Sequence, residues 1–353
     1  MQLGATYNTG KKSTDLYNKG VTAGAAYVNA SPDEVVFGSS ATQLFRNLSI
    51  ALDFPPEAEI IVSKLDHEAN IASWVQLAEW KGFALKWWSA TSPTNPVLDL
   101  AELQKLLSPR TRLVTCTHTS NILGTISDIK AIARMVHEVP DALLCVDGVA
   151  YAPHRPLDMK DLGADFYSFS WYKVFGPHIA MLYASRVAQK HMRSLGHYFK
   201  PSHTLEDKLG LAGANYECVQ SIPRIVQYLE SQTWQAIIDH ETRIQELFLT
   251  YLRGKDDVQI YGVADSDLQA RVPVISFTVG ERTSSSVVEA FEKRTGGNIG
   301  LRSGHFYSKR LINDVMKLRG EDGVVRVSMV HYNTEEEVKV LIDNLDAVLR
   351  SRA

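Results

Sequence analysis

The sequence CVDGVAYAPHRPLDMKDLGADFYSFSWYKVFGPHIAMLYAS, from Cys145 to Ser185, contains the features that decide the fold. Its first apolar run, 142–146, predicts a strand that ends at Asp147. A second run, 165–170, predicts a strand that leads into Lys173, and a third apolar strand follows at 179–183. Ligands of open α/β sheets bind at the carboxyl ends of the strands. We therefore expect Asp147 and Lys173 to lie at one edge of a sheet, with opposite charges.

An acid and a lysine in this arrangement suit pyridoxal 5'-phosphate (PLP). Lys173 would hold the aldehyde as a Schiff base, and Asp147 would keep the pyridinium nitrogen protonated. The hydroxyls of Ser170 and Tyr172, next to the lysine, would contact the phosphate. Taken singly, an acid after a strand is more often a helix N-cap, and a lone lysine is more often a surface charge. The pattern as a whole favours the cofactor.

The stretch resembles the aminotransferase class V group of PLP enzymes, and within it the cysteine desulfurase-like proteins. This group has an aspartate after a strand, then a Ser-x-(His/Tyr)-Lys cluster, then a Gly-Pro turn, and all three are present here between Asp147 and Pro177. The resemblance extends over nearly the whole chain. It implies that Met1 corresponds to a point some way into the family's sequence, after a segment that the relatives usually carry.

Two segments before this stretch have the family's cofactor-binding pattern. After a predicted strand at 34–37, Ser39 and Ser40 precede an amphipathic helix, where backbone N–H groups and the helix dipole favour an anion. The resemblance implies that they bind the phosphate. His67, in Asp66-His67-Glu68-Ala69, matches the histidine that stacks on the pyridine ring and can move protons. A plain serine N-cap and a structural histidine are the ordinary alternatives.

Three further residues match the family's site. Asn121, in Ser-Asn-Ile-Leu-Gly-Thr, matches the asparagine that bonds the phenolic oxygen of the cofactor, although a turn asparagine is common. Arg302, in Arg-Ser-Gly-His, matches the arginine that grips the α-carboxylate of the substrate, as a planar two-pronged donor does. Arg326 matches a second arginine that supports this pocket. Either arginine could instead be a surface charge.

Two departures from the family pattern matter for the reaction. Desulfurases carry a nucleophilic cysteine just after Arg-x-Gly-His, and here that position is Tyr307. A tyrosine cannot carry sulfur as a persulfide. Desulfurases also commonly have a glutamine three residues after the aspartate, and here that position is Ala150.

Alternating strands and helices predict an α/β protein with a mostly parallel sheet covered by helices. The resemblance implies PLP fold type I with a seven-stranded sheet. The pattern further predicts a large cofactor-binding domain, 1–230, followed by a smaller α+β domain, 231–353, with strands near 272–279 and 324–330 and a terminal helix, 334–349. The polar, glycine-rich segment 203–216 reaches the partner subunit's cofactor in relatives, which implies a homodimer with the site near its interface.

Composition limits the possible partners. The chain has 353 residues, 45% of them hydrophobic, and a net charge of −3, which gives no electrostatic reason to bind nucleic acid or an anionic membrane. No apolar run reaches the length of a membrane span, and no metal-ligand spacing is present. Three widely spaced cysteines, Cys116, Cys145 and Cys218, indicate a reduced cytoplasmic protein.

Three functions remain open from the sequence. The first is a C–S lyase that cleaves a cysteine-type amino acid by β-elimination without a protein persulfide. The second is carbon–carbon bond formation after loss of a side-chain carboxylate, implied by resemblance to a fungal branch of secondary metabolism in 86–89, 169–173 and 330–334. The third is a catalytically impaired PLP-binding homologue. The expected partner besides PLP is a small-molecule amino-acid substrate.

Overall fold

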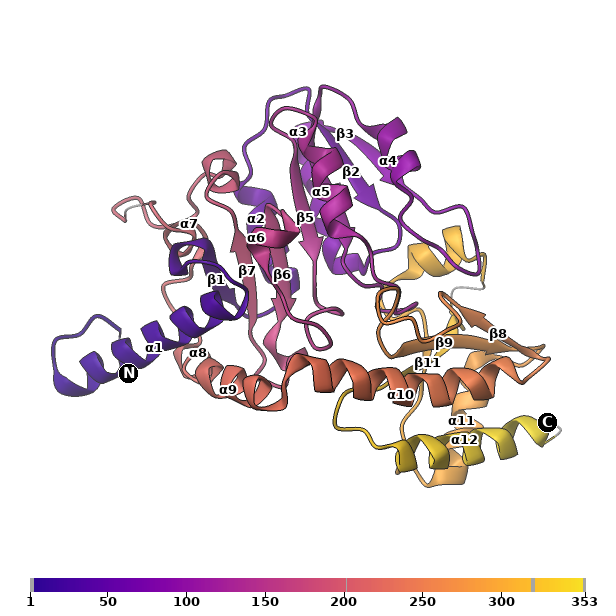
Figure 1. Cartoon of the computed structure of the whole chain (residues 1–353). Coiled ribbons are helices and arrows are strands. Elements are labelled where there is room, and N and C mark those ends of the chain that lie inside the picture. The colour runs from indigo at the N-terminus through magenta and orange to yellow at the C-terminus, as the bar shows by residue number, and fades with distance from the viewer. Residues whose placement is uncertain (1–2, 201, 319–320, 352–353) are drawn as a thin grey trace.

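The computed structural model describes residues 3–200, 202–318 and 321–351, which form two β-sheets and the helices around them (Figure 1). The larger sheet has the strand order β1-β7-β6-β5-β4-β2-β3. Its strands are β1 (Val35–Gly38), β2 (Glu59–Ser63), β3 (Ala84–Trp88), β4 (Thr111–Thr117), β5 (Leu143–Asp147), β6 (Phe166–Ser170) and β7 (Ala180–Ala184). Strands β6, β5, β4, β2 and β3 pair in parallel, and β7 runs antiparallel to both β6 and β1.

Helices cover both faces of this sheet. They are α1 (Asn8–Tyr27), α2 (Ala41–Ala51), α3 (Ala72–Lys81), α4 (Leu100–Leu106), α5 (Ile129–His137), α6 (Met159–Leu162), α7 (Leu205–Leu209), α8 (Tyr216–Val219) and α9 (Ile222–Gln232). One core layer receives side chains from α1, α4, α5, α8 and α9, and the other receives them from α2, α3 and α7. Ile61 of β2 faces the first layer while Ile60 and Val62 face the second, as the alternation of strand side chains requires.

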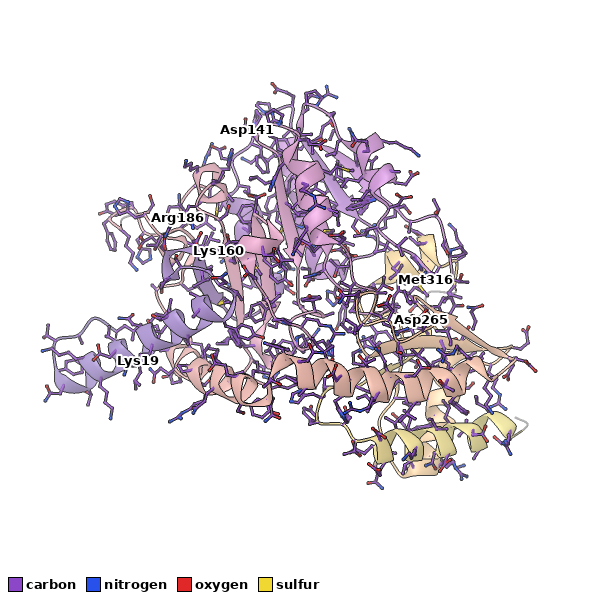
Figure 2. All side chains as sticks on the ribbon, viewed as in Figure 1. Lys19, Asp141, Lys160, Arg186, Asp265 and Met316 are labelled. Atoms are coloured by element: carbon purple, nitrogen blue, oxygen red, sulfur yellow. The ribbon has the colours of Figure 1, made fainter. Side chains whose placement is uncertain are left out.

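Helix α1 packs closely on the helices that follow the sheet, and its N-terminal part extends away from the body (Figure 1). A Cβ atom on Gly20 would lie 2.2 Å from the carbonyl oxygen of Val219, so this crossing requires glycine. The hydroxyl of Tyr17 donates a hydrogen bond to Glu206 at 2.7 Å. Figure 2 shows Lys19 on the side of α1 that faces away from the sheet.

The second sheet is antiparallel, with the order β10-β11-β9-β8. Its strands are β8 (Val258–Tyr261), β9 (Val274–Val279), β10 (Arg302–Gly304) and β11 (Val324–Ser328), and it packs on α10 (Trp234–Arg253), α11 (Ser284–Thr295) and α12 (Glu335–Arg350). The strands near 272–279 and 324–330 and the terminal helix were predicted. Strands β8 and β10 were not, because four and three residues are too few to show a period.

The long helix α10 connects the two parts of the molecule (Figure 1). It contributes Ile237 to the core of the larger sheet and Ile244 to the core of the smaller one. The predicted division at residue 230 lies just before this helix and stays a prediction. A separate mixed core joins Leu65 and Ile122, from the larger unit, to Leu311 and Val324. In the described ranges, no helix combines the length and the apolar character that crossing a membrane needs.

Candidate active site

A pocket opens where β4, β5 and β6 end and α2 begins. The predicted meeting of Asp147 and Lys173 at one edge of the sheet is confirmed. The residues that line the pocket are Ser40, Ala41, Thr42, His67, Ala69, Thr117, Thr119, Asn121, Asp147, Val149, Ala150, Ser170, Tyr172 and Lys173.

Asp147 is the last residue of β5 and lies at the floor of this pocket. Its Oδ1 accepts a hydrogen bond from the backbone N–H of Val149 at 2.9 Å. Burial raises the pKa of this carboxyl, and the charge of Lys173 acts in the opposite direction. The following residue must be glycine, because a Cβ on Gly148 would lie 2.0 Å from the ring of Tyr167. The pocket therefore presents the desolvated carboxylate of Asp147 to any cation that binds there.

Lys173 lies in the 3₁₀ turn Trp171–Lys173 that ends β6. Burial lowers its pKa, Asp147 partly restores it, and the charge of Arg326 lowers it further. Among the described parts of the chain, no carboxylate forms an ion pair with Lys173. A lysine with a lowered pKa is more often a neutral amine, the form that attacks an aldehyde.

His67 forms part of the pocket wall. Its Nδ1 accepts a hydrogen bond from the N–H of Ala69 at 3.0 Å, so in the neutral ring the proton is on Nε2. Burial, together with the charges of Lys173 and Arg326, lowers its pKa to about 4. At neutral pH His67 is therefore an uncharged imidazole that offers one N–H donor.

The first turn of α2 forms the side of the pocket where the phosphate is expected. Ser40 is the N-cap, and its hydroxyl accepts from the N–H of Gln43 at 3.1 Å. Ser39, also expected at the phosphate, is exposed and outside the pocket lining, and its N–H donates to the side chain of Gln43 at 3.0 Å. Thr42, which the sequence argument passed over, lines the pocket instead. Its position in the first helical turn beside the N-cap is the signal that could have identified it.

The two arginines lie side by side. Arg302 of β10 is directly opposite Arg326 of β11 in the antiparallel register, so both side chains are on one face of the sheet. Arg302 is exposed, whereas Arg326 is the half-buried inner one. Burial and the charge of Arg302 lower the pKa of Arg326 to about 10. Neither arginine is among the residues that line the pocket, and the role of Arg302 as the principal carboxylate grip stays a prediction.

Arg326 is held by contacts on two sides. Its guanidinium carbon lies 3.8 Å from the ring centroid of Phe306, and its Nη1 donates to the carbonyl oxygen of Asn121 at 2.9 Å. Its Nε is buried without a hydrogen-bond partner in the described chain. Such a group costs free energy unless a ligand satisfies it.

The loop that contains Phe306 and Tyr307 is fixed to the larger sheet. The Nδ2 of Asn121 donates to the carbonyl oxygen of Phe306 at 3.0 Å, and the N–H of Glu68 donates to that of Tyr307 at 2.8 Å. Phe306 and Tyr307 both have positive φ angles, 47° and 60°, which cost free energy in residues other than glycine. The ring of Tyr307 is 5.3 Å from that of His67, and the residue is 71% exposed at the mouth of the pocket.

Two hydroxyls of the pocket were also missed from the sequence. Thr117, Thr119 and Asn121 all line it, at every second position where β4 ends. This is the period of an extended chain, in which alternate side chains face the same way. Extending the strand pattern through the polar run after Thr117 would have placed Thr119 beside Asn121.

The pocket suits PLP on chemical grounds. Asp147 offers a carboxylate for the pyridinium, and Lys173 an amine for the aldehyde. The hydroxyl of Thr119 is buried and has no hydrogen-bond partner in the described chain, so a bound polar ligand would satisfy it. In the same ranges, no group of three or more His, Cys, Asp or Glu residues could hold a metal ion.

A helix-covered, mostly parallel sheet with a lysine and an aspartate at its carboxyl edge defines a PLP-dependent enzyme. The chain belongs to the aminotransferase class-V family, whose model matches residues 3–341. It is 51% identical over 352 residues to the aminotransferase-like protein FGM3 of Gibberella zeae, covering 99% of this chain and 87% of that protein. It is 45% identical over 341 residues to the cysteine desulfurase-like protein ustD of Aspergillus flavus, covering 94% and 77%.

Solved structures confirm the predicted fold type I architecture. The apo cysteine desulfurase of Thermococcus onnurineus NA1 superposes with a TM-score of 0.87 at 21% sequence identity, covering 99% of this chain and 88% of that one. The cysteine desulfurase CsdA of Escherichia coli gives 0.84 at 22% identity, covering 98% and 86%. At such identities the likeness establishes the fold.

Proposed function

We propose that the protein is a C–S lyase that cleaves a cysteine-type amino acid by β-elimination and releases sulfide or thiol. The observation that carries this proposal is Tyr307, which stands where the desulfurase pattern has its sulfur-accepting cysteine and lies beside His67. A phenol does not form a persulfide, so sulfur that leaves the substrate is not retained at this position.

The remaining thiols support the same proposal. Cys116 and Cys145 are fully buried in β4 and β5, and burial raises the pKa of both thiols. Protonated, enclosed thiols are inert as nucleophiles. Cys218, half-buried on α8, is outside the residues that line the pocket.

Substrate binding is proposed for the paired arginines. Arg326 would donate hydrogen bonds to the α-carboxylate of the substrate. Its Nε has no partner in the described chain, and its guanidinium lies over the ring of Phe306. The charges of Arg326 and Lys173 both contribute to the lowered pKa of His67. Arg302 would add a second positive charge at the outer side.

The bound cofactor supplies an electron sink that lowers the barrier to breaking a bond at the substrate's α-carbon. Asp147 holds the positive charge that this requires. Lys173, as a free amine, would move the proton at the α-carbon of the substrate. His67, neutral and protonated on Nε2, would donate a hydrogen bond to the departing sulfur, which leaves as the thiolate.

A second candidate is carbon–carbon bond formation after loss of a side-chain carboxylate. The adjacent Arg302 and Arg326 favour it, because two guanidinium groups on one face suit a substrate with two carboxylates. The fungal relatives at 51% and 45% identity are consistent with either reaction. The third possibility, an impaired homologue, is disfavoured because the pocket keeps Asp147, Lys173, His67 and Asn121 together.

The test is incubation of the purified holoenzyme with L-cysteine, a cysteine S-conjugate and L-aspartate in parallel, with and without an aldehyde acceptor. A C–S lyase releases sulfide or thiol with pyruvate and ammonia from the first two. Consumption of L-aspartate with release of carbon dioxide, and no action on the sulfur substrates, overturns the first proposal in favour of the second.

We also propose a cytoplasmic homodimer with the site near the interface. Four apolar side chains around α7 are exposed, and Tyr198 is completely so: they are Leu195, Tyr198, Phe199 and Leu211. Exposed apolar side chains gathered in one part of the chain support an interaction site there. Sedimentation of the holoenzyme as a monomer would contradict the dimer.

A further inference from the structure

Thr119 combines two properties that together indicate a ligand contact. It lines the pocket with Asp147 and Lys173, and its Oγ1 is buried without a partner in the described chain. The residue itself is fully buried. An unpaired buried hydroxyl costs free energy, so such groups in native proteins normally have a hydrogen-bond partner.

The chain around Thr119 explains why no protein group reaches its hydroxyl. The hydroxyl of Thr117 donates to the carbonyl oxygen of Thr119 at 2.8 Å, and the N–H of Ser120 donates to the carbonyl oxygen of Thr125 at 3.1 Å. These bonds fix the backbone on both sides of Thr119. They leave its side chain where β4 ends, on the side of Thr117 and Asn121.

The other polar atoms of PLP already have candidate partners in this pocket. The pyridinium nitrogen belongs with Asp147, the aldehyde carbon with Lys173, and the phosphate with Ser40 and Thr42 at the start of α2. The phenolic oxygen, next to the aldehyde on the ring, is the remaining polar atom. In the bound cofactor it is an anionic acceptor, which a hydroxyl donor stabilises.

Few other side chains of the pocket can donate to this oxygen. Ala150 lines the pocket and offers no side-chain donor. The side-chain amide of Asn121 already has two protein partners, because its Nδ2 donates to the carbonyl oxygen of Phe306 and its Oδ1 accepts from the hydroxyl of Ser308 at 2.9 Å. The Thr119 hydroxyl is a further donor in the same lining.

We propose that the Thr119 hydroxyl donates a hydrogen bond to the phenolic oxygen of PLP and is a cofactor-binding residue of this enzyme. The proposal rests on the cofactor and is independent of which substrate bond is broken. It makes Thr119 a determinant of cofactor affinity and of the visible spectrum of the bound cofactor.

The experiment measures PLP binding to cofactor-free protein by titration, with the visible absorption band as a second readout. Thr119→Val, which replaces the hydroxyl by a methyl group of similar size, is expected to raise the Kd for PLP by about ten- to a hundredfold, the usual effect of losing a hydrogen bond to a charged acceptor. The visible absorption band of PLP bound to Thr119→Val is expected to lie at a different wavelength from that of the unaltered protein. Its dependence on pH is expected to lie over a different pH range. Thr119→Ser keeps the hydroxyl and is expected to bind with a Kd close to that of the unaltered protein.

Thr115→Val is the matched control. The Oγ1 of Thr115 is also buried and without a partner in the described chain, but Thr115 lies farther back in β4, outside the pocket lining. It tests whether removing a buried threonine hydroxyl from this strand weakens binding in general. Equal weakening by Thr115→Val and Thr119→Val, or equal weakening by Thr119→Ser, overturns the proposal.

A PLP analogue that lacks the 3-hydroxyl group identifies the atom. If Thr119 contacts that oxygen, the analogue binds Thr119→Val and the unaltered protein with the same Kd. A penalty that persists with the analogue shows that Thr119 acts elsewhere. If Thr119→Val does not fold, as judged by thermal unfolding of the cofactor-free protein, Thr119→Ala takes its place in the same comparison. Unaltered PLP affinity and band in the folded variant also overturn the proposal.

Discussion

Asn121 and Ser308 are joined across the boundary between the two sheets, because the Ser308 hydroxyl donates to the Asn121 Oδ1 at 2.9 Å. The bond ties the cofactor pocket to the loop that contains Phe306 and Tyr307. Glu68 adds an ion pair to Arg310 at 3.3 Å from the other side of that loop. The loop that carries the sulfur-accepting cysteine in desulfurases is therefore a fixed wall here, with an aromatic side chain in the cysteine's place.

Lys173→Ala is expected to abolish the covalent bond between enzyme and PLP while the fold remains. Lys173 is the lysine of the pocket lining, and no other lysine is near enough to replace it among the lining residues. The check is borohydride reduction followed by peptide mass spectrometry. Covalent PLP on the same peptide in the variant would show that another group forms the bond.

Asp147→Ala is expected to lower kcat by about a hundredfold or more, because several kcal/mol of stabilisation of the developing negative charge would be lost. Asp147→Asn keeps the shape and is expected to lose a similar factor. Turnover is measured at saturating PLP so that weaker binding of the cofactor does not lower the measured kcat. Near-normal turnover in Asp147→Ala would contradict the proposed role of the carboxylate.

Arg326→Lys is expected to raise the KM for the amino acid by about tenfold or more, since a single ammonium cannot replace a two-pronged donor stacked on Phe306. Arg302→Lys, at the exposed position opposite, is the control and is expected to have the smaller effect. A larger increase in KM for Arg302→Lys than for Arg326→Lys would show that Arg302 is the principal ligand of the carboxylate.

No protein persulfide is expected after turnover with L-cysteine. The measurement is intact-protein mass spectrometry before and after reduction, and the positive control is Tyr307→Cys, which places a thiol beside His67 and is expected to gain one sulfur. A stoichiometric sulfur on Cys116, Cys145 or Cys218 of the unaltered protein would show that it is a desulfurase.

Asp66 is expected to contribute less to the stability of the cofactor-free protein as the pH rises. Burial raises the pKa of Asp66 to about 8, while its unfolded value is about 4. A raised folded pKa contributes stability that is complete below the unfolded value and is lost as the pH increases toward the folded value. The lowered pKa values of the buried His67 and His118 act in the opposite direction below about pH 6.5. Comparison of the thermal unfolding midpoint of Asp66→Asn with that of the unaltered protein, from about pH 4 to pH 8, isolates the Asp66 contribution, and an unchanged slope in that variant would contradict the assignment.

The sequence by itself determined the larger sheet and the opposite charges at its edge. The apolar runs of β5 and β6 end in Asp147 and Lys173, and parallel pairing brings their carboxyl ends to one side. His67, Ser40 and Asn121 line the pocket, but local pattern alone favoured a structural histidine, a plain N-cap and a turn asparagine. The family resemblance singled them out and supplied their expected roles.

Only the tertiary structure decided whether Arg302 or Arg326 lies deeper and that the Thr119 hydroxyl lacks a partner in the described chain. It also decided the hydrogen-bond partners of the Asn121 side chain. Arg302 and Arg326 meet through the register of two antiparallel strands, and Asn121 meets Ser308 although 187 residues separate them. Pairings over such distances depend on how separately formed units pack, which no local period encodes. The unpaired state of Thr119 depends on the burial that this packing creates, since a hydroxyl exposed to water needs no protein partner.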